Sequence, residues 1–428
     1  MFDKQQLKSL VLEQKKALSG GDIGVVREKY AELVSHLMIP HALVIAGLRR
    51  AGKSTLLLQL IKQQYQWDVY YFNLEDERLI GFTVQDFNTL YEIMLELYGE
   101  QKIFFLDEIQ NIPEWERFVR RLQNENIKFI ITGSNASLLS KELGTKLTGR
   151  YIQIELLPYS FKEFLNYHQT SYDEKSFLIT TERALLKKQF NEYMQLGGIP
   201  EYVKYRLPHI LTTLYENILY KDIIVRYEIH SVRAFRELAV YLISNVGTLI
   251  SYTKLKNTLN LGSVNTVKNY IYYLENAYLI FTIDSYAYSI LQRTISQKKV
   301  YAIDTGLIQA LSIQFSRNTG KYLENIVFLE LRRRHELVFY YRTANNLEVD
   351  FIVQQGKKII SLIQVCESLS NEKTRQRELA AITIAMNELK MKHGWILTLD
   401  ETEVIELSPQ TTITVIPVYQ WLLNAHQT

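Results

Sequence analysis

The residues with the clearest chemical character form a glycine-rich loop between an apolar run and a helical one. Gly47 to Ser54 reads Gly-Leu-Arg-Arg-Ala-Gly-Lys-Ser and matches G-x-x-x-x-G-K-[ST], a pattern that wraps backbone N–H groups around phosphates. Residues 38–46 before it form an apolar strand, and the Leu and Ile spacing after Ser54 predicts a helix whose N-terminus also favours an anion. A chance glycine-rich turn is the alternative, but the flanking strand and helix argue against it.

The loop therefore predicts an ATP site with a bound Mg²⁺. The Lys53 ammonium is expected on the β- and γ-phosphates, and the Ser54 hydroxyl on the metal. The residues expected to contact the nucleotide are Gly47, Leu48, Arg49, Arg50, Ala51, Gly52, Lys53, Ser54 and Thr55.

A second motif supplies two carboxylates. The apolar run Ile103–Leu106 ends in Asp107 and Glu108, at the end of a strand where open α/β sheets bind ligands. Asp107 is expected to hold Mg²⁺ through water, and Glu108 to orient and polarise the attacking water. A solvated acidic strand end is the alternative, which the neighbouring loop disfavours.

Two further polar residues are candidates for catalysis. The run Lys128–Thr132 leads into Gly133-Ser134-Asn135, where Asn135 either senses the γ-phosphate or caps the helix ASLLSKEL, and both roles are compatible. Arg150 lies a few residues before the next strand and is either a surface arginine or an arginine finger, acting on its own subunit or on a neighbour.

Composition limits the classes of protein that fit. The 428 residues are 47% hydrophobic and 22% charged with a net charge of +3, which is typical of a globular protein of about three domains and too weak a charge to indicate nucleic acid. No apolar run is long enough to span a membrane, and the polar N-terminus does not resemble a signal peptide. The single cysteine, Cys366, excludes an intramolecular disulfide and fits a reducing cytoplasm.

Strands alternating with helices over the first part of the chain predict a parallel sheet covered on both faces. Helical spacing follows, and a helix-turn-helix pattern from Ile250 to Ile280 with two short strand-like runs after it suggests a winged helix. A second α/β region closes the chain. The expected divisions are 1–35, an N-terminal helical segment; 36–160, the P-loop ATPase core; 161–240, a helical lid or linker; 241–310, the winged helix; and 311–428, the final α/β domain.

The helix Val264–Ile280 would be the recognition helix of such a domain. Asn265, Thr266, Lys268 and Asn269 near its start are suited to a DNA groove. Its several tyrosines are equally suited to packing against another domain, so the partner is either DNA or protein.

Four segments together resemble one family of bacterial and archaeal AAA-type ATP-binding proteins: GLRRAGKST, IFFLDEIQNIPEWE, IITGSNASLLSKEL…LTGRYIQIELLPYSFKEF and LGGIPEYV. The resemblance runs from about Val44 to Val418. It implies an AAA-like ATPase coupled to a C-terminal part of unassigned function, which looks like a winged helix followed by a PD-(D/E)xK nuclease-like (restriction-endonuclease-like) fold. It also implies a homo-oligomer in which Arg150 reaches the neighbouring subunit's site.

The nuclease-like pattern is incomplete in this sequence. It needs a helical Glu, an Asp on one strand, and an acid and a Lys two residues apart on the next, with the acids holding Mg²⁺. Glu324 and Asp350 fit the first two places, whereas Gln364 stands where the acid belongs and Cys366 where the lysine belongs. A weak second metal site at Glu324, Asp350 and Gln364 is conceivable, but we expect the domain to be degenerate and Cys366 to be a small core residue.

The leading hypothesis from sequence is an ATPase that acts as a nucleotide-driven switch on its C-terminal half. An ATP-linked, metal-dependent DNA nuclease and a slowly hydrolysing, nucleotide-dependent scaffold or sensor are the alternatives. The intact Asp107–Glu108 pair favours true hydrolysis, and Gln364 and Cys366 disfavour the nuclease.

Overall fold

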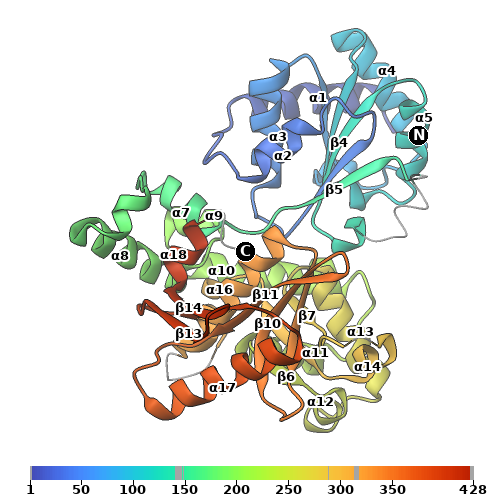
Figure 1. Cartoon of the computed structure of the whole chain (residues 1–428). Coiled ribbons are helices and arrows are strands. Elements are labelled where there is room, and N and C mark those ends of the chain that lie inside the picture. The colour runs from blue at the N-terminus through green and yellow to red at the C-terminus, as the bar shows by residue number, and fades with distance from the viewer. Residues whose placement is uncertain (1, 140–146, 148, 288, 313–317, 425–428) are drawn as a thin grey trace. The chain divides into compact units, whose positions relative to one another are not determined.

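The computed structural model describes residues 2–139, 147, 149–287, 289–312 and 318–424. The chain divides into two compact units, Met1–Leu157 with Asn276–Tyr278, and Pro158–Glu275 with Leu279–Thr428 (Figure 1). Within the described residues, no helix combines the length and the apolar character needed to cross a bilayer.

A parallel five-stranded sheet forms the middle of the first unit, in the order β2-β3-β4-β1-β5. Its strands are β1 (Ala42–Ala46), β2 (Tyr70–Asn73), β3 (Ile103–Asp107), β4 (Lys128–Gly133) and β5 (Tyr151–Glu155). The register pairs Ala46 with Gly133 and Asp107 with Asn73, so the carboxyl ends share one edge of the sheet. The predicted parallel sheet is confirmed, and both motifs leave it at this edge.

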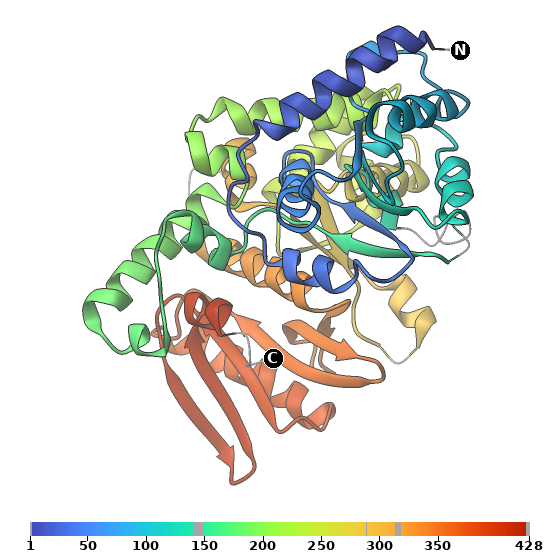
Figure 2. The same ribbon diagram turned by 90° about the horizontal axis from the view of Figure 1, so that it is seen from above.

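Helices cover both faces of this sheet, as Figures 1 and 2 show. They are α1 (Lys4–Ser19), α2 (Lys29–Ser35), α3 (Lys53–Leu60), α4 (Phe87–Tyr98) and α5 (Glu116–Gln123). Because side chains alternate along a strand, Phe104 packs edge-on against Phe118 of α5, whereas its neighbour Phe105 packs with Leu57 of α3. The N-terminal helix α1 packs against α4 and β2, so the expected N-terminal segment belongs to the same unit as the ATPase core.

The second unit begins with helices: α7 (Phe161–Tyr167), α8 (Thr180–Leu196), α9 (Pro200–Tyr205), α10 (His209–Asn217) and α11 (Val232–Ser244). The region expected to be a lid is therefore packed with the C-terminal half of the chain. An antiparallel three-stranded sheet follows, in the order β6-β8-β7. Its elements are β6 (Thr248–Ile250), α12 (Tyr252–Thr258), α13 (Val264–Asn276), β7 (Ile280–Ile283), α14 (Ile290–Ile295) and β8 (Lys298–Ala302).

The C-terminal region is a mixed six-stranded sheet in the order β13-β14-β12-β11-β10-β9. Its elements are α15 (Thr305–Leu311), α16 (Thr319–Arg334), β9 (Leu337–Arg342), β10 (Glu348–Gln355), β11 (Lys358–Val365), α17 (Glu372–Glu388), β12 (His393–Thr398), β13 (Glu403–Ser408), β14 (Thr411–Pro417) and α18 (Val418–Leu423). Strands β9, β10 and β11 are antiparallel neighbours, and β12 runs parallel to β11. The second α/β region predicted from sequence is present.

Helix α14 and the β13–β14 hairpin are among the elements that were not predicted. Helix α14 interrupts the connection between β7 and β8, which sequence analysis took as two short strands alone. The β13–β14 hairpin lies at the edge of the sheet (Figure 2), where most side chains of β13 are exposed and no apolar alternation marks the strand.

Candidate functional site

The glycine-rich loop joins β1 to α3 at the carboxyl edge of the sheet, and two glycines determine its path. A Cβ atom on Gly47 would lie 2.1 Å from the carbonyl oxygen of Leu156, so no larger residue fits there. Gly52 has φ of 96°, in the left-handed region that glycine tolerates best. The backbone therefore closes into the turn that the motif predicts.

Lys53, the first residue of α3, is turned back into this loop and is only 4% exposed. Its Nζ donates to the carbonyl oxygens of Gly47 and Leu48, at 3.2 and 3.1 Å, and lies 3.1 Å from Oε1 of Glu108. The three N–H donors of the ammonium are thus used within the loop and by the carboxylate of the second motif. The structure brings the two motifs together as expected.

Asp107 ends β3 and is fully buried. The Thr132 hydroxyl donates to its Oδ1, Ser54 also bonds to the carboxylate, and the Tyr71 hydroxyl lies 3.4 Å from Oδ2. Burial and the neighbouring Glu108 charge raise the pKa of Asp107, against the bonds from Thr132 and Ser54. The two expected magnesium ligands, Ser54 and Asp107, are therefore already in contact.

Glu108 follows in a left-handed conformation, with φ of 53°. Its Oε1 pairs with Lys53, and its Oε2 accepts from Nε2 of Gln110 at 2.6 Å. Burial opposes ionisation of this carboxyl, but the charge of Lys53 and the bond from Gln110 outweigh it and lower the pKa of Glu108. The carboxylate is therefore ionised at neutral pH, as a residue that accepts a proton from water must be.

Sequence analysis did not identify Gln110, and it did not single out Thr132. The short helical turn Ile109–Asn111 brings Gln110 back beside Glu108, and its amide also donates to Ser134 Oγ at 3.1 Å. Thr132 follows Ile131, the β4 partner of Leu106, so its hydroxyl also accepts from the backbone N–H of Glu108 at 3.0 Å. The spacing Glu-x-Gln was the signal available for Gln110, and the register between β3 and β4 was the signal for Thr132.

Asn135 is buried and directly precedes the short helical turn Ala136–Leu139. Its carbonyl oxygen accepts from the Leu138 backbone N–H at 3.1 Å. The rest of the helix expected at ASLLSKEL, residues 140–143, lies outside the described residues. Both roles considered for the Asn135 side chain stay predictions. In the same segment, Thr132 bonds to Asp107 and Glu108, and Ser134 bonds to Gln110.

Arg150 lies at the opposite edge of the sheet from the loop. It directly precedes β5, whose first residue pairs with Ala42 at the start of β1. The loop follows the other end of β1, and a five-residue strand is about 16 Å long. The guanidinium is exposed and donates to Oδ1 of Asn124 at 2.8 Å. The structure therefore does not bring Arg150 to its own subunit's site, and a finger role is compatible only with a neighbouring subunit.

A cavity of about 560 Å³ opens beside the loop. Ser54 and Thr55 of α3, Tyr71 and Asn73 of β2, and Gln14 of α1 are among the residues that line it. Gln14 is bonded to Asn73, since it accepts from the Asn73 N–H at 2.8 Å and donates to the Asn73 carbonyl at 3.0 Å. The volume is within the range of small-molecule sites.

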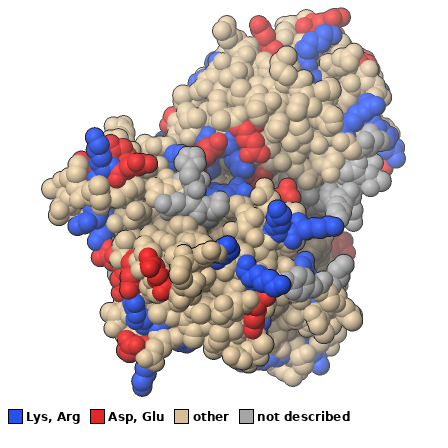
Figure 3. All heavy atoms as spheres, viewed as in Figure 1, with Lys and Arg blue, Asp and Glu red and all other residues tan. Residues whose placement is uncertain are grey.

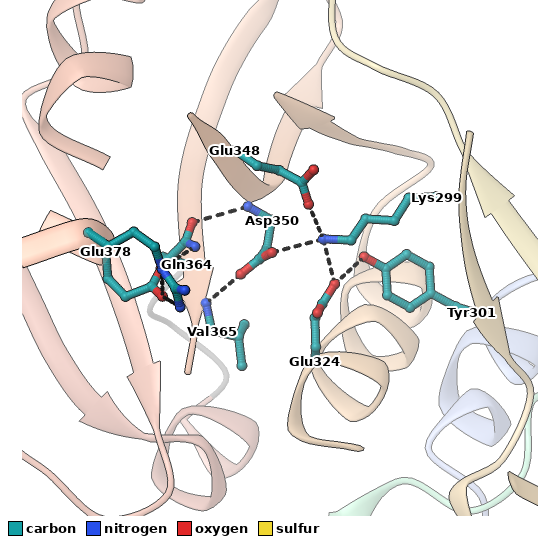
Figure 4. Close-up of polar contacts among 9 residues, drawn as sticks. Lys299, Tyr301, Glu324, Glu348, Asp350, Gln364, Val365 and Glu378 are labelled. Atoms are coloured by element: carbon teal, nitrogen blue, oxygen red, sulfur yellow. Dashed lines mark hydrogen bonds and ion pairs between the residues drawn. The ribbon is translucent and has the colours of Figure 1, made fainter. Parts of the chain in front are cut away.

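The residues considered for a second metal site also meet, in the C-terminal region (Figure 4). Asp350 and Gln364 lie on neighbouring strands, and the Gln364 Oε1 accepts from the Asp350 N–H at 3.2 Å. Glu324 of α16 lies beside a cation that sequence analysis missed, because Lys299 of β8 pairs with both Glu324 and Asp350, at 2.7 and 2.8 Å. Cys366 stands at the lysine position of the motif, as the sequence indicates, but Lys299 supplies the cluster with a cation from another strand.

The expectation for Cys366 is borne out by its surroundings. The residue is buried within the apolar cluster between the six-stranded sheet and α17, and burial raises the pKa of its thiol to about 12. Among the described residues, no group of His, Cys, Asp and Glu side chains is arranged as a metal site.

Family models match three parts of the chain: an AAA domain at residues 40–165, and domains of unknown function at residues 187–318 and 319–421. An uncharacterized protein of Methanocaldococcus jannaschii is 36% identical over 407 residues, which are 90% of this chain and 89% of the relative. The chain belongs to this family of AAA-domain proteins. An uncharacterized Haemophilus influenzae protein is 32% identical over 94% of this chain and 99% of its own length.

Among solved structures, the DNA-bound Orc1 protein of Aeropyrum pernix aligns with 69% of this chain and 94% of its own, at 13% identity and a TM-score of 0.32. A similarity this low supports no conclusion about what this chain binds. The AAA-type assignment stands on the domain match and on the site geometry of the first unit.

Glu108→Gln is expected to bind ATP normally but to lower the single-turnover hydrolysis rate by about 10²–10⁴-fold, because an amide cannot accept a proton from water. Calorimetry and rapid-quench kinetics measure the two effects. Glu114→Gln is the matched control, since Glu114 is an exposed acid nearby that pairs with Arg117. A Glu108→Gln rate close to wild type would show that another residue polarises the water.

Proposed function

We propose that the protein is a Mg²⁺-dependent ATPase whose nucleotide state acts on its C-terminal half. The observation that supports hydrolysis is the meeting of Lys53, Glu108, Asp107 and Ser54 at one edge of a parallel sheet. The residues fit the cofactor: the loop offers backbone donors and an ammonium for phosphates, and Ser54 with Asp107 offers oxygen ligands for Mg²⁺.

When bound, ATP with Mg²⁺ supplies the phosphoryl group and the charge neutralisation for its transfer. The chain's own residues then do the rest. Lys53 exchanges the carbonyl oxygens of Gly47 and Leu48 for phosphate oxygens, because a charged acceptor binds an ammonium more strongly than a carbonyl does. Glu108 loses its pairing with Lys53, stays oriented by Gln110 and takes the proton of the attacking water.

The route from the loop to the C-terminal half is short. Leu156 donates its N–H to the Ala46 carbonyl at 2.8 Å, and its own carbonyl oxygen lies against Gly47. Arg27, which is buried, donates to the carbonyl oxygens of Ala51 and Leu157, both at 2.6 Å. The second unit begins at the next residue, Pro158, so a rearrangement of the loop acts on the backbone that leads into it.

The helices and strands that follow Pro158 support a winged helix followed by a nuclease-like fold. Three helices with an antiparallel sheet in the order β6-β8-β7 fit a winged helix, and α16, three antiparallel strands, α17 and a parallel β12 fit the PD-(D/E)xK arrangement. On α13, Asn265, Lys268 and Asn269 are exposed and could bind DNA, whereas Tyr273 is stacked on Tyr227 and has a packing role. Basic and acidic side chains are interspersed on the face in Figure 3, so a protein partner is equally compatible.

The purified protein is expected to hydrolyse ATP in Mg²⁺ without cutting DNA. Phosphate release with and without double-stranded DNA, single-stranded DNA and RNA identifies any stimulating nucleic acid, and a parallel plasmid assay in Mg²⁺ and Mn²⁺ measures cutting. Cys366→Lys alone is not expected to restore cutting, because Gln364 is neutral. Robust cutting by the native sequence that is abolished by Asp350→Ala would instead establish the ATP-linked nuclease.

Arg150 is proposed to complete the ATP site of a neighbouring subunit. Arg150→Ala and Lys53→Ala are each expected to lose most turnover, and their mixture to recover a fraction of it, since one mixed interface then holds both an intact loop and an intact arginine. Steady-state turnover of the mixture against each variant alone measures the recovery. Arg117→Ala, an exposed arginine of the same unit, is the control. A chain that stays monomeric with ATP at micromolar concentration would contradict the proposal.

A further inference from the structure

The acidic cluster of the C-terminal region surrounds one buried ammonium. Nζ of Lys299, whose side chain is 1% exposed, lies 2.7 Å from Glu324, 2.7 Å from Glu348 and 2.8 Å from Asp350 (Figure 4). An ammonium has three donors, and here each one meets a carboxylate. Lys299 is therefore ion-paired with three acids at once.

These contacts occupy both oxygens of Asp350 and one oxygen each of Glu324 and Glu348. Oδ1 of Asp350 binds Lys299 and Oδ2 accepts from the Val365 N–H at 2.9 Å. Oε1 of Glu324 binds Lys299 and accepts from the Tyr301 hydroxyl at 2.7 Å. A divalent ion placed between these acids would lose the ligands that Lys299 holds and would be repelled by its charge.

The neighbouring residues do not supply replacement ligands. Gln364 Nε2 donates to Glu378 at 2.6 Å, and its Oε1 already accepts from Asp350. The residues present therefore do not fit the divalent metal that a nuclease-like fold implies. The register of β10 shifts between Val349 and Ile352, and this bulge interrupts the alternation of side chains at Asp350.

The surrounding structure prevents Lys299 from withdrawing. It lies on β8, the central strand of the three-stranded sheet, and the next residues along β8 are fixed to α16. Tyr301 stacks on Phe328 with ring centroids 4.2 Å apart, and Ala302 exchanges two backbone bonds with the Asn325 amide, at 2.8 and 3.0 Å. Gly247, before β6, leaves the space that Glu324 fills, since a Cβ there would lie 2.7 Å from its Oε2.

We propose that Lys299 is a built-in cation that takes the place of a divalent metal in the acidic cluster and joins the three-stranded sheet to α16 and β10. The carboxylates keep their convergent arrangement, so the chain carries a latent metal site that the lysine closes. A cavity of about 400 Å³ lined by Glu324, Glu348, Asp350 and Gln364 gives ions access to it. The Lys299 cluster lies wholly within the second unit, so its role does not depend on ATP hydrolysis.

The test is Mn²⁺ binding to the nucleotide-free full chain, measured by electron paramagnetic resonance and by thermal unfolding. The wild type is expected to bind no Mn²⁺ at this cluster and to unfold at the same temperature with or without the ion. Lys299→Met is expected to unfold at a lower temperature, to bind one Mn²⁺ at least about tenfold more tightly than the wild type, and to regain stability when the ion is added, since a ligand that binds only the folded state stabilises it. Asp350→Asn in the same chain should remove the gained binding.

Lys298→Met is the matched control. Lys298 is the neighbouring lysine on the same strand, partly exposed and paired with Asp284 at 3.2 Å, so its loss should not create a metal site. Wild-type binding of Mn²⁺ that depends on Asp350 would overturn the proposal. A folded Lys299→Met chain that gains no Mn²⁺ binding would also overturn it. The same holds for a Lys299→Met chain that remains unfolded in millimolar Mn²⁺.

Discussion

The close approach of Gly47 to the backbone of Leu156 is the constraint on which the rest of the account depends. The first residue of the phosphate-binding loop has no room for a side chain, because a Cβ would lie 2.1 Å from the Leu156 carbonyl oxygen. At the other end of the same short segment, the Tyr159 N–H donates to the Gly198 carbonyl at 2.7 Å, and a Cβ on Gly198 would lie 2.3 Å from the Tyr159 carbonyl oxygen. The segment 156–159 therefore contacts Gly47 in the first unit through Leu156 and Gly198 in the second unit through Tyr159.

In the proposed function, the signal that this segment carries would come from the electrostatics of the ATP site. Lys53 is held by the loop's carbonyl oxygens and by Glu108, so the site contains its own counter-charge. In the proposed function, bound phosphates would replace those contacts and free Glu108. The loop that carries Lys53 also holds Arg27 through the Ala51 carbonyl, and Arg27 holds Leu157. The loop is thus linked to the boundary of the unit through a few direct bonds, along which a charge exchange at the phosphates would act in the proposed function.

The parts of the fold that sequence predicted are those with strong local signals. The strands β1, β3 and β4 are apolar runs that end in polar motifs, and the loop pattern fixes the first helix after β1. Gln110 was missed because the Glu-x-Gln spacing brings the two side chains together only through the tight turn Ile109–Asn111. Lys299 was missed because it is 51 residues from Asp350 and in a run, Lys298-Lys299, that is typical of an exposed strand. Its role follows only from the packing of β8 on α16, a tertiary contact that no periodicity encodes.

The most direct test of the switch is the distance between the two units in different nucleotide states. Spin labels at Lys102→Cys and Lys357→Cys, both exposed, report one distance distribution, and the native Cys366 is buried. In the Glu108→Gln chain with bound ATP, the mean distance between the labels is predicted to differ by several ångström from that of the ADP-bound chain. This difference is predicted to vanish with Lys53→Ala. Identical distributions with ATP and ADP, in a protein that hydrolyses ATP, would contradict the account.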